Sequence, residues 1–325
     1  MKRTSTFGAA LFGLVLALAG SAPAKEPLKI GYSDWPGFTA WEIGKVQGIF
    51  KKNGVDVELV WFPVYTDSLT ALNTGQLDAN LQTWSDTMAP LAEGIDLKVV
   101  QILDNSFGND AIVAKPPIDS VKGLKGKTVG TELATVDHFM LLHALAANGM
   151  SEKDIKYTNL TVGDAAAAFI AGKLDAAAIW QPWISQIQRE GTGKVIYSSA
   201  DMPGLIPDLT VFQGKVVKER PDDVQAAVKS YFEIVAFIRG HEDEAVAIMA
   251  KVVEQPADAY KAFLPGTKFF DLEQNLNGFE KRDDPSSLYG SGKIIAEFLK
   301  SQDQIKKVPD FGAALEPKFI KALKK

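Results

Sequence analysis

Cysteine is absent from this chain of 325 residues, and histidine occurs only three times. Without cysteine the chain forms no disulfide, so its stability has to come from a large apolar core. A lipid anchor on the exported protein is excluded too, because it would need a cysteine just after the signal segment. So few nucleophiles and metal ligands predict no metal site, no cofactor and little capacity for nucleophilic catalysis.

Long apolar runs are missing as well, except at the very start of the chain. Residues 1–24 combine Lys2 and Arg3 with an apolar run and an Ala-Pro-Ala sequence at residues 22–24. This order is typical of a secretory signal peptide, and its apolar part is too short to span a bilayer stably. We therefore predict a signal peptide over residues 1–24 and a soluble mature protein in the periplasm.

The chain also has no excess of basic over acidic residues. The chain carries 35 Lys and Arg against 40 Asp and Glu, and removal of Lys2 and Arg3 with the signal leaves 33 against 40, a net charge of −7. Nucleic acids and anionic membranes bind basic patches, so we expect neither as a partner. About 300 mature residues suffice for a large core and suggest two domains.

What the mature chain does contain is an internal repeat. Residues 69–84 and 166–183 both read as a helix, then Gly-x-Leu-Asp-Ala, then a short apolar strand that leads to tryptophan. A strand, a helix and a second strand precede each of these segments, so the order β-α-β-α-β occurs twice. This pattern predicts an α/β protein with two similar lobes, each a mostly parallel sheet flanked by helices.

Two segments predict crossings between the lobes. The stretch DNSFGNDAIVAKPP, residues 104–117, predicts a crossover into the second lobe, and IPDLTVFQGKVV, residues 206–217, predicts the return. We therefore predict that the first lobe comprises residues 25–110 and 212–325, and that the second comprises residues 111–211. Two crossing strands form a hinge that permits closure by rotation.

The predicted strand ends are rich in tryptophan, and open α/β sheets bind ligands beyond the carboxyl ends of their strands. Four of the six tryptophans follow predicted strands: Trp35, Trp84, Trp180 and Trp183. Their corresponding positions in the two lobes predict a cleft with aromatic walls. The other two, Trp41 and Trp61, we interpret as packing within the first lobe.

Carboxylates accompany these tryptophans, whereas lysine and arginine are absent from the same loops. The acidic residues at the strand ends and the crossover are Asp34, Asp86, Asp110, Glu132 and Asp137. Asp137 is explained equally well as a helix cap, and Asp34 suits turn chemistry better than a ligand contact. Asp110 lies in the predicted hinge, where no helix begins. Aromatic faces with carboxylates favour a cation, whereas a sulfonate or nitrate needs helix N-terminal N–H groups or an arginine.

The chain resembles the nitrate/sulfonate/taurine-type (NMT1-like) substrate-binding proteins of ABC transporters over nearly all of residues 28–302. The resemblance rests on the stretches IGYSDWPGF, GIFKKNGVDVELVWF, LTALNTGQLDA, VKGLKGKTVGT, AAAAFIAGKLDAAAIWQPW and ERPDDVQAAVKSYFE. It implies a two-lobed periplasmic binding protein fold with a two-strand hinge. It also implies a monomer without enzymatic activity that delivers one small solute to an inner-membrane permease and its ATPase.

The resemblance further implies ligand contacts from the loops after corresponding strands. The expected ligand-binding residues are Trp35, Gln82, Trp84, Asp110, Glu132, Thr135, Asp137 and Trp180. The stretches YSDWPGF, DNSFGND and TVDHF resemble the subgroup linked to urea-carboxylase-type operons, which implies guanidine or a urea-like solute.

Three alternatives stay open. The solute could be taurine, an aliphatic sulfonate or nitrate, although sulfonate-binding members keep hydroxyl and amide groups where this chain has Asp137. It could also be a pyrimidine precursor of thiamine, since tryptophans would hold a pyrimidine by stacking. The third alternative is a secreted hydrolase that uses the paired carboxylates of Asp110 and Asp137.

Overall fold

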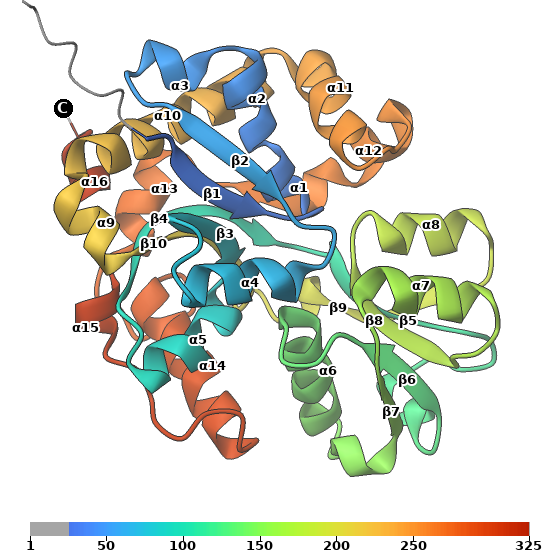
Figure 1. Ribbon diagram of the computed structural model, residues 1–325. Helices are drawn as coiled ribbons and strands as arrows, with labels where there is room; N and C mark the ends of the chain where they lie inside the picture. Colours follow the sequence, from blue (N-terminus) through green and yellow to red (C-terminus); the bar gives the residue numbers. More distant parts are fainter. Residues whose placement is uncertain (1–25, 325) are drawn as a thin grey trace, which may run out of the picture.

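Two lobes, each built on its own β-sheet, make up the protein (Figure 1). The computed structural model describes residues 26–324, so the predicted signal peptide lies outside the described residues. The first lobe contains the strands β1 (Leu28–Tyr32), β2 (Val57–Trp61), β3 (Ala79–Thr83), β4 (Leu97–Ser106), β10 (Pro207–Gln213) and β11 (Thr267–Phe269). The second contains β5 (Asp110–Ala114), β6 (Thr128–Thr131), β7 (Lys156–Asn159), β8 (Ala176–Trp180) and β9 (Lys194–Ser198). Their orders are β11-β4-β10-β3-β1-β2 and β7-β6-β8-β5-β9.

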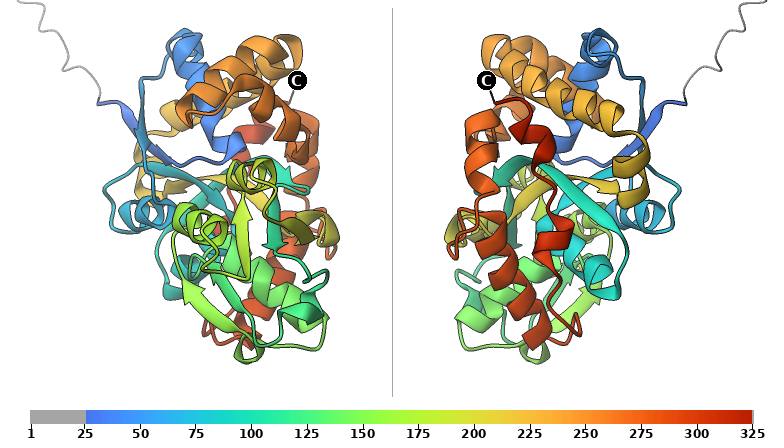
Figure 2. Two further views of the ribbon diagram at one scale, coloured as in Figure 1. Left: turned by 90° about the vertical axis from the view of Figure 1, so that its right-hand side faces the viewer. Right: turned by 90° about the vertical axis from the view of Figure 1, so that its left-hand side faces the viewer.

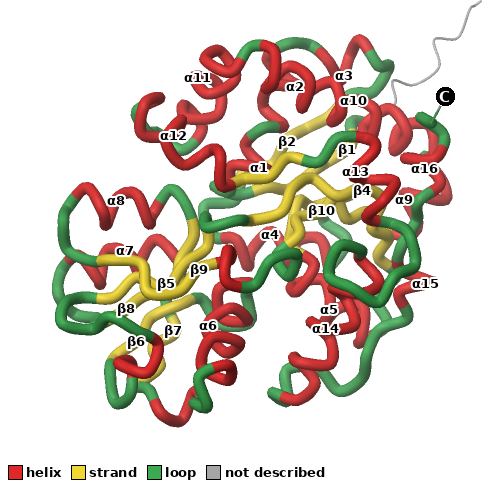
Figure 3. The backbone as a smooth tube through the Cα atoms, turned by 180° about the vertical axis from the view of Figure 1, so that it is seen from behind, coloured by secondary structure: helices red, strands yellow, loops and turns green. Residues whose placement is uncertain are grey.

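Helices cover both sheets. In the first lobe they are α1 (Pro36–Thr39), α2 (Trp41–Val46), α3 (Ile49–Lys52), α4 (Tyr65–Asn73), α5 (Trp84–Glu93), α9 (Gly214–Glu219), α10 (Pro221–Gly240), α11 (Glu242–Val252), α12 (Ala257–Phe263), α13 (Leu272–Gly278), α14 (Leu288–Ser301), α15 (Phe311–Ala314) and α16 (Lys318–Lys321). In the second lobe they are α6 (Val136–Ala147), α7 (Val162–Ile170) and α8 (Trp183–Arg189). Seen from behind, the strands form two separate groups, one in each lobe (Figure 3).

The parallel part of each sheet reproduces the predicted repeat. Strand β1 pairs in parallel with β2 and β3, and β6 pairs in parallel with β7 and β8. In both lobes the first helical segment ends at an Asn-Gly pair, where Gly54 and Gly149 have φ angles of 81° and 71°. Glycine adopts this left-handed conformation without a steric penalty, so the chain can turn sharply into the next strand.

Strands β5 and β10 run antiparallel to both of their neighbours, so each sheet is mixed although most of its strands point the same way, as the repeat predicts. Strand β10 is antiparallel to β3 and β4, and β5 is antiparallel to β8 and β9. The cause is the crossing between lobes. Strands β5 and β10 each carry the chain in from the other lobe, so they enter their sheets from the opposite end.

The predicted lobe boundaries need a correction at both crossings. Asp110 already pairs with Trp180 in the second sheet, and residues 207–211 already pair within the first sheet. The chain therefore crosses at residues 107–109 and 199–206, rather than after 110 and 211. Residues 206–217 form one mainly apolar run, which does not mark the point where the second crossing ends. A hydrogen bond of 2.7 Å from the Gly108 N–H to the Ser199 Oγ joins the two crossings.

The C-terminal third of the chain packs around the first lobe. Figure 2 shows its last segment, coloured red, running along one side of the molecule. Trp41 on α2 is fully buried and stacks on Phe50 and on Tyr231 of α10, with ring centroids 5.8 and 6.3 Å apart. Burial of an aromatic side chain of this size removes about 150–250 Å² from water and stabilises by about 4–6 kcal/mol before entropy is counted. Helix α10 is thereby held against the N-terminal half of the lobe.

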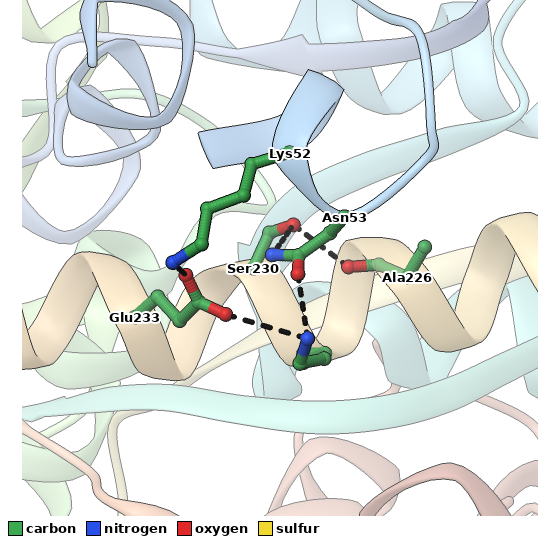
Figure 4. A network of polar contacts seen from close by, with 6 residues as sticks. Lys52, Asn53, Ala226, Ser230 and Glu233 are labelled. Carbon is green, nitrogen blue, oxygen red and sulfur yellow. Dashed lines mark hydrogen bonds and ion pairs between the residues drawn. The ribbon is translucent and has the colours of Figure 1, made fainter. Parts of the chain in front are cut away.

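Polar contacts fix the end of α3 on α10 (Figure 4). The Lys52 Nζ lies 2.8 Å from the Glu233 Oε2, and the Asn53 Nδ2 donates to the Ser230 Oγ over 3.0 Å. The Lys229 Nζ donates to the Asn53 Oδ1 over 2.7 Å. Exposed ion pairs contribute only about 0–1 kcal/mol each, so this network orients the helices more than it stabilises them. Among the described residues, no helix combines the length and hydropathy that a membrane span requires.

Candidate functional site

A small cavity lies between the lobes, where strands of both sheets end. It is tight, with a volume of ≈ 10 Å³. Its lining comes from both lobes: Ser33, Trp35, Phe38, Tyr65, Thr83 and Asp208 from the first, and Asp110, Val136 and Trp180 from the second. This position beyond the carboxyl ends of β1, β3 and β8 is where α/β sheets bind ligands.

Aromatic rings form much of the cavity wall. Tyr65 meets Trp180 edge to face across the lobes, with centroids 5.6 Å apart and an interplanar angle of 85°. Phe38 stacks on Tyr65 at 6.4 Å from the opposite side. The Tyr65 hydroxyl accepts a hydrogen bond of 3.0 Å from the Thr83 N–H, which fixes the ring in place. Aromatic faces of this kind attract a cation over the ring.

Two carboxyl groups complete the lining and have free acceptor atoms. Asp110 begins β5, Asp208 lies near the start of β10, and their side chains are only 2% and 1% exposed. The Oδ2 of Asp110 and both carboxyl oxygens of Asp208 have no hydrogen-bond partner in the structure. Buried polar atoms are almost always paired, so oxygens left free in a cavity mark a place where a donor can bind.

Further buried carboxyl groups lie behind this lining. Asp104 on β4 is the register partner of Asp208 on β10, and the Trp35 Nε1 donates to its Oδ1 over 3.1 Å. Asp137, in the first turn of α6, is completely buried, and neither of its oxygens has a partner. Asp86 on α5 accepts a hydrogen bond of 3.0 Å from the neighbouring Ser85 hydroxyl.

Burial raises the pKa of every carboxyl group in this set. Loss of hydration, with repulsion from neighbouring carboxylates, raises the pKa of Asp104 and of Asp110 to about 7. The same causes raise the pKa of Asp137 and of Asp208 well above the ordinary range, and burial raises the pKa of Asp86 to about 6. None of the lining residues is a lysine, arginine or histidine that could lower these values. The site is therefore rich in acceptors and poor in positive charge.

The turn Ser33–Phe38 is shaped to bring Trp35 and Asp104 together. Helix α1 begins at Pro36 directly after Trp35, where the fixed φ of proline suits the first helical position. A Cβ atom on Gly37 would lie 1.8 Å from the Asp104 Oδ2, so only glycine leaves room for that carboxyl group. The residue types of this turn thus place an indole ring against the buried carboxyl group of the neighbouring hinge strand.

Asp34, which the sequence assigns to turn chemistry, joins the two lobes instead. Its Oδ1 accepts from the Trp180 Nε1 over 2.8 Å, and its Oδ2 accepts from the Trp183 Nε1 over 2.7 Å. Asp34 belongs to the first lobe and both tryptophans belong to the second. We call these three side chains the indole clasp. Burial raises the pKa of Asp34 to about 6, against the two indole hydrogen bonds, which act to lower it.

Glu132 makes a second bridge between the lobes. Its Oε1 accepts from the Thr66 Oγ1 over 2.6 Å and from the Thr66 N–H over 3.3 Å at the start of α4. Farther out, Phe139 of α6 packs edge to face on Phe298 of α14, with centroids 5.6 Å apart. These contacts and the indole clasp hold the lobes in a closed arrangement around the cavity.

The structure brings together three of the eight expected ligand-binding residues: Trp35, Asp110 and Trp180 line the cavity. Trp84 does not line it, although it follows a strand as predicted. Its indole is fully buried, donates to the Leu288 carbonyl over 3.0 Å and packs on Phe311. Gln82 is also turned away, because its amide is occupied by Asn80 and Thr87 inside the first lobe.

The remaining expected residues lie near the cavity without lining it. Glu132 faces an outer cleft between the lobes and bonds Thr66. Thr135 precedes α6, and its hydroxyl donates to the Glu132 carbonyl over 2.8 Å, which shapes the turn before the helix. Asp137 is buried where the charges of Asp110 and Asp86 act on it.

Several residues of the cavity and the outer cleft were not predicted from the sequence. Asp104 and Asp208 carried a usable signal, since each is the one acidic residue of its strand. Phe38 and Tyr65 carried none, because a lone aromatic residue near a helix start is usually core. Trp61, interpreted as internal packing, is instead 38% exposed beside the outer cleft. Within residues 26–324, no group of three His, Asp or Glu side chains is arranged to hold a metal ion.

Two α/β lobes joined by two crossings and closed over one small cavity define a solute-binding protein of the periplasmic type. A family model described as "NMT1/THI5 like" matches residues 35–245, and the chain belongs to this family. The match covers both tryptophans of the indole clasp, the aromatic walls and both carboxyl groups that line the cavity, and it begins one residue after Asp34.

Relatives and solved structures agree with this class. A protein of Escherichia coli described as "Putative aliphatic sulfonates-binding protein" is 28% identical over 76% of this chain and 77% of its own length. The taurine-binding periplasmic protein of the same organism is 24% identical over 83% and 85%. The structure of an alkanesulfonate-binding protein from Xanthomonas axonopodis pv. citri bound to MOPS superposes with a TM-score of 0.77 at 21% identity, over 90% of this chain and 100% of that one.

The chain is therefore a periplasmic binding protein of the ABC-importer type. Such proteins bind a small molecule and work with a permease and its ATPase. The open alternative of a secreted hydrolase is not supported, because these relatives are binding proteins and not enzymes.

Proposed function

We propose that this protein binds a small nitrogen-containing cation, of which guanidinium is the simplest candidate, and delivers it to an ABC importer. The proposal rests on one observation: Asp110 and Asp208 present free carboxyl oxygens into a cavity with aromatic walls and no basic residue in its lining. The side chains of Trp35, Tyr65 and Trp180 line the same cavity.

The physical chemistry of the lining favours a cation. A cation over an aromatic face gains about 0.5–2 kcal/mol, and a guanidinium group donates parallel hydrogen bonds to a carboxylate. An anion 4 Å from one of these carboxylates would be repelled by about 4 kcal/mol at the effective dielectric constant usual near protein surfaces. The charge of a candidate ligand should therefore affect its binding more than its size does.

A second candidate is taurine or another aliphatic sulfonate, and two observations favour it. The relatives named above bind aliphatic sulfonates and taurine. In addition, Val136, the first residue of α6, lines the cavity, and the N-terminus of a helix attracts anions. Asp137 in the same first turn opposes a sulfonate, whereas the ammonium group of taurine could still meet Asp110. A pyrimidine precursor of thiamine is the third solute in the test, since the same rings would stack on it.

A thermal-shift and calorimetric screen tests the proposal. The purified mature protein is titrated at pH 8 with millimolar guanidinium chloride, methylammonium chloride, urea, taurine, potassium nitrate and a thiamine pyrimidine. A ligand at 100 times its dissociation constant stabilises the folded protein by about 2.7 kcal/mol. We expect guanidinium to raise the melting temperature, and taurine and nitrate to leave it unchanged. Stabilisation by taurine or nitrate, with none by the cations, refutes the proposed ligand class.

Two variants locate the binding site. Asp110→Asn keeps the shape of the side chain but removes its charge, so it should weaken guanidinium binding at least tenfold. The matched control is Asp310→Asn. Asp310 begins α15 and its Oδ1 accepts from the Gly312 N–H over 2.8 Å, a capping role that asparagine fills equally well. This control should bind guanidinium like the wild type.

A further inference from the structure

The strands that form the hinge carry a pair of carboxyl groups at the base of the cavity. Asp104 near the end of β4 and Asp208 near the start of β10 are register partners on neighbouring antiparallel strands. Both are at least 99% buried, and Asp208 also lines the cavity. Because both belong to the first sheet, they stay side by side whether the lobes are open or closed.

This pair needs a proton. Two carboxylates buried side by side repel each other, and the repulsion is relieved when one of them is protonated. Asp104 and Asp208 are register partners on adjacent strands, and the charge of Asp104 raises the pKa of Asp208. The Trp35 Nε1–H bonds the Asp104 Oδ1 and favours the charged form of Asp104, so Asp208 is the member that holds the proton. The protonated member is thus the one that faces the ligand.

Within the part of the chain that the structure describes, no basic side chain acts on the pair in place of that proton. The pair interacts electrostatically with Asp110 on β5, Asp86 on α5, Tyr65 on α4, Tyr231 on α10 and Tyr260 on α12. Asp137, Asp34 and Glu132 belong to the same acidic set. The one basic group among these interactions, Arg239, acts on Tyr231, is 54% exposed and pairs with Asp271. Burial raises the pKa of Asp104 to about 7 and that of Asp208 well above its ordinary value, which supports the presence of the proton near neutral pH.

We propose that the cleft exchanges a proton for its cation: the ligand displaces the proton shared by Asp104 and Asp208, and that proton leaves to solvent. In this step the O–H bond of the Asp208 carboxyl group breaks, its electron pair stays on the oxygen, and the resulting carboxylate pairs with the cation. The total charge inside the cavity is unchanged, since one positive charge enters and one leaves. The inference rests on the proposed function, because it assumes that the ligand is a cation.

Exchange of this kind predicts a particular dependence on pH. Where the pair holds its proton, each unit of pH should raise the affinity for a cation about tenfold. The affinity should level off once the pair is ionised without ligand. A neutral ligand such as urea displaces no proton, so its affinity should not rise in this way.

Calorimetry in two buffers tests the exchange. Guanidinium chloride is titrated into the mature protein at pH 6.5, in phosphate and in imidazole, whose ionisation enthalpies differ. We expect the binding heat to differ between the buffers by the amount for about one released proton, and the affinity to rise about tenfold from pH 5.5 to 6.5. The Asp208→Asn variant, which has no acidic proton at this position, should release none, and the Asp310→Asn control should match the wild type. If Asp208→Asn fails to fold, Asp104→Asn serves, because it breaks the same carboxyl pair.

The outcomes separate the two proposals. If guanidinium binds with equal heat in both buffers and equal affinity at both pH values, the exchange is refuted and cation binding stands. Proton uptake on binding also refutes it. If guanidinium and methylammonium fail to bind at every pH up to 8 while taurine binds, the proposed function is wrong and the exchange falls with it.

Discussion

Removal of the charge at Asp34 should open the protein. In the indole clasp, one carboxylate accepts the N–H groups of Trp180 and Trp183 over 2.8 and 2.7 Å across the lobes. In Asp34→Asn, the amide oxygen can accept a hydrogen bond from one indole N–H. The amide nitrogen then faces the second indole N–H, and these two groups cannot bond because both are donors. At pH 8 the wild-type group is ionised, since burial raises its pKa only to about 6.

The size of the effect follows from these two bonds. Hydrogen bonds to charged groups contribute about 1.5–3 kcal/mol each, and a buried donor without a partner costs about 1–3 kcal/mol. In the open form both indoles and the carboxylate bond water, so the loss applies to the closed form alone. We take about 3 kcal/mol as the shift, which corresponds to a decrease of roughly 100-fold in the ratio of closed to open protein.

Two measurements check the opening. Small-angle X-ray scattering at pH 8 should show a larger radius of gyration for Asp34→Asn than for the wild type, and ligand affinity should fall by up to the same 100-fold. Trp183→Phe removes only one N–H and should give a smaller shift in the same direction. The Asp310→Asn control should scatter like the wild type. An unchanged radius and affinity in Asp34→Asn would show that the clasp does not set the closure equilibrium.

Two further predictions concern the tryptophans and the buried carboxyl groups. Trp84→Ala should cost about 3–5 kcal/mol of folding free energy in thermal unfolding. Trp35→Phe should lower ligand affinity with a smaller loss of stability. Weaker binding by a folded Trp84→Ala would contradict the assignment of Trp84 to the core. The empty protein should become less stable from pH 5 to pH 8, because a carboxyl group whose pKa rises from 3.8 to about 7 on folding keeps its proton only in the folded state. That contribution is complete below pH 3.8 and is lost as the pH rises through 7, by up to about 4 kcal/mol for one such group, of which about 2.7 kcal/mol is lost above pH 5. Thermal unfolding across this pH range measures it, and a stability that rises with pH would contradict it.

Much of the fold could be predicted from local patterns. The repeat of β-α-β-α-β appears because Gly75 and Gly172 occupy the same turn in both lobes, and both have positive φ angles. The order of strands in the parallel half of each sheet follows from that repeat. The direction of β5 and β10 does not, because it depends on where the chain re-enters a lobe, which is a property of the whole topology.

The candidate site was predictable only in part, for a related reason. Trp35 and Trp180 follow strands and point into the cavity, but Trp84 also follows a strand and points into the core, because α14 and Phe311 lie behind it. Nothing near Trp84 in the sequence indicates that a segment some 200 residues later will take up its indole. Asp34 was misread in the same way, since its partners belong to the other lobe.

The indole clasp also affects how efficiently the protein can deliver its solute to a transporter. All its atoms belong to the protein, so the lobes can shut on an empty cavity without any cargo. A closed molecule without solute has the same surface as a closed molecule with solute, so it would bind the permease without delivering anything. Cargo can bias the equilibrium only by its differential affinity for the shut form. The strength of the clasp therefore sets the fraction of encounters with the permease in which no solute is delivered. A variant with a stronger clasp would bind its solute more tightly, but import of the solute would be less efficient.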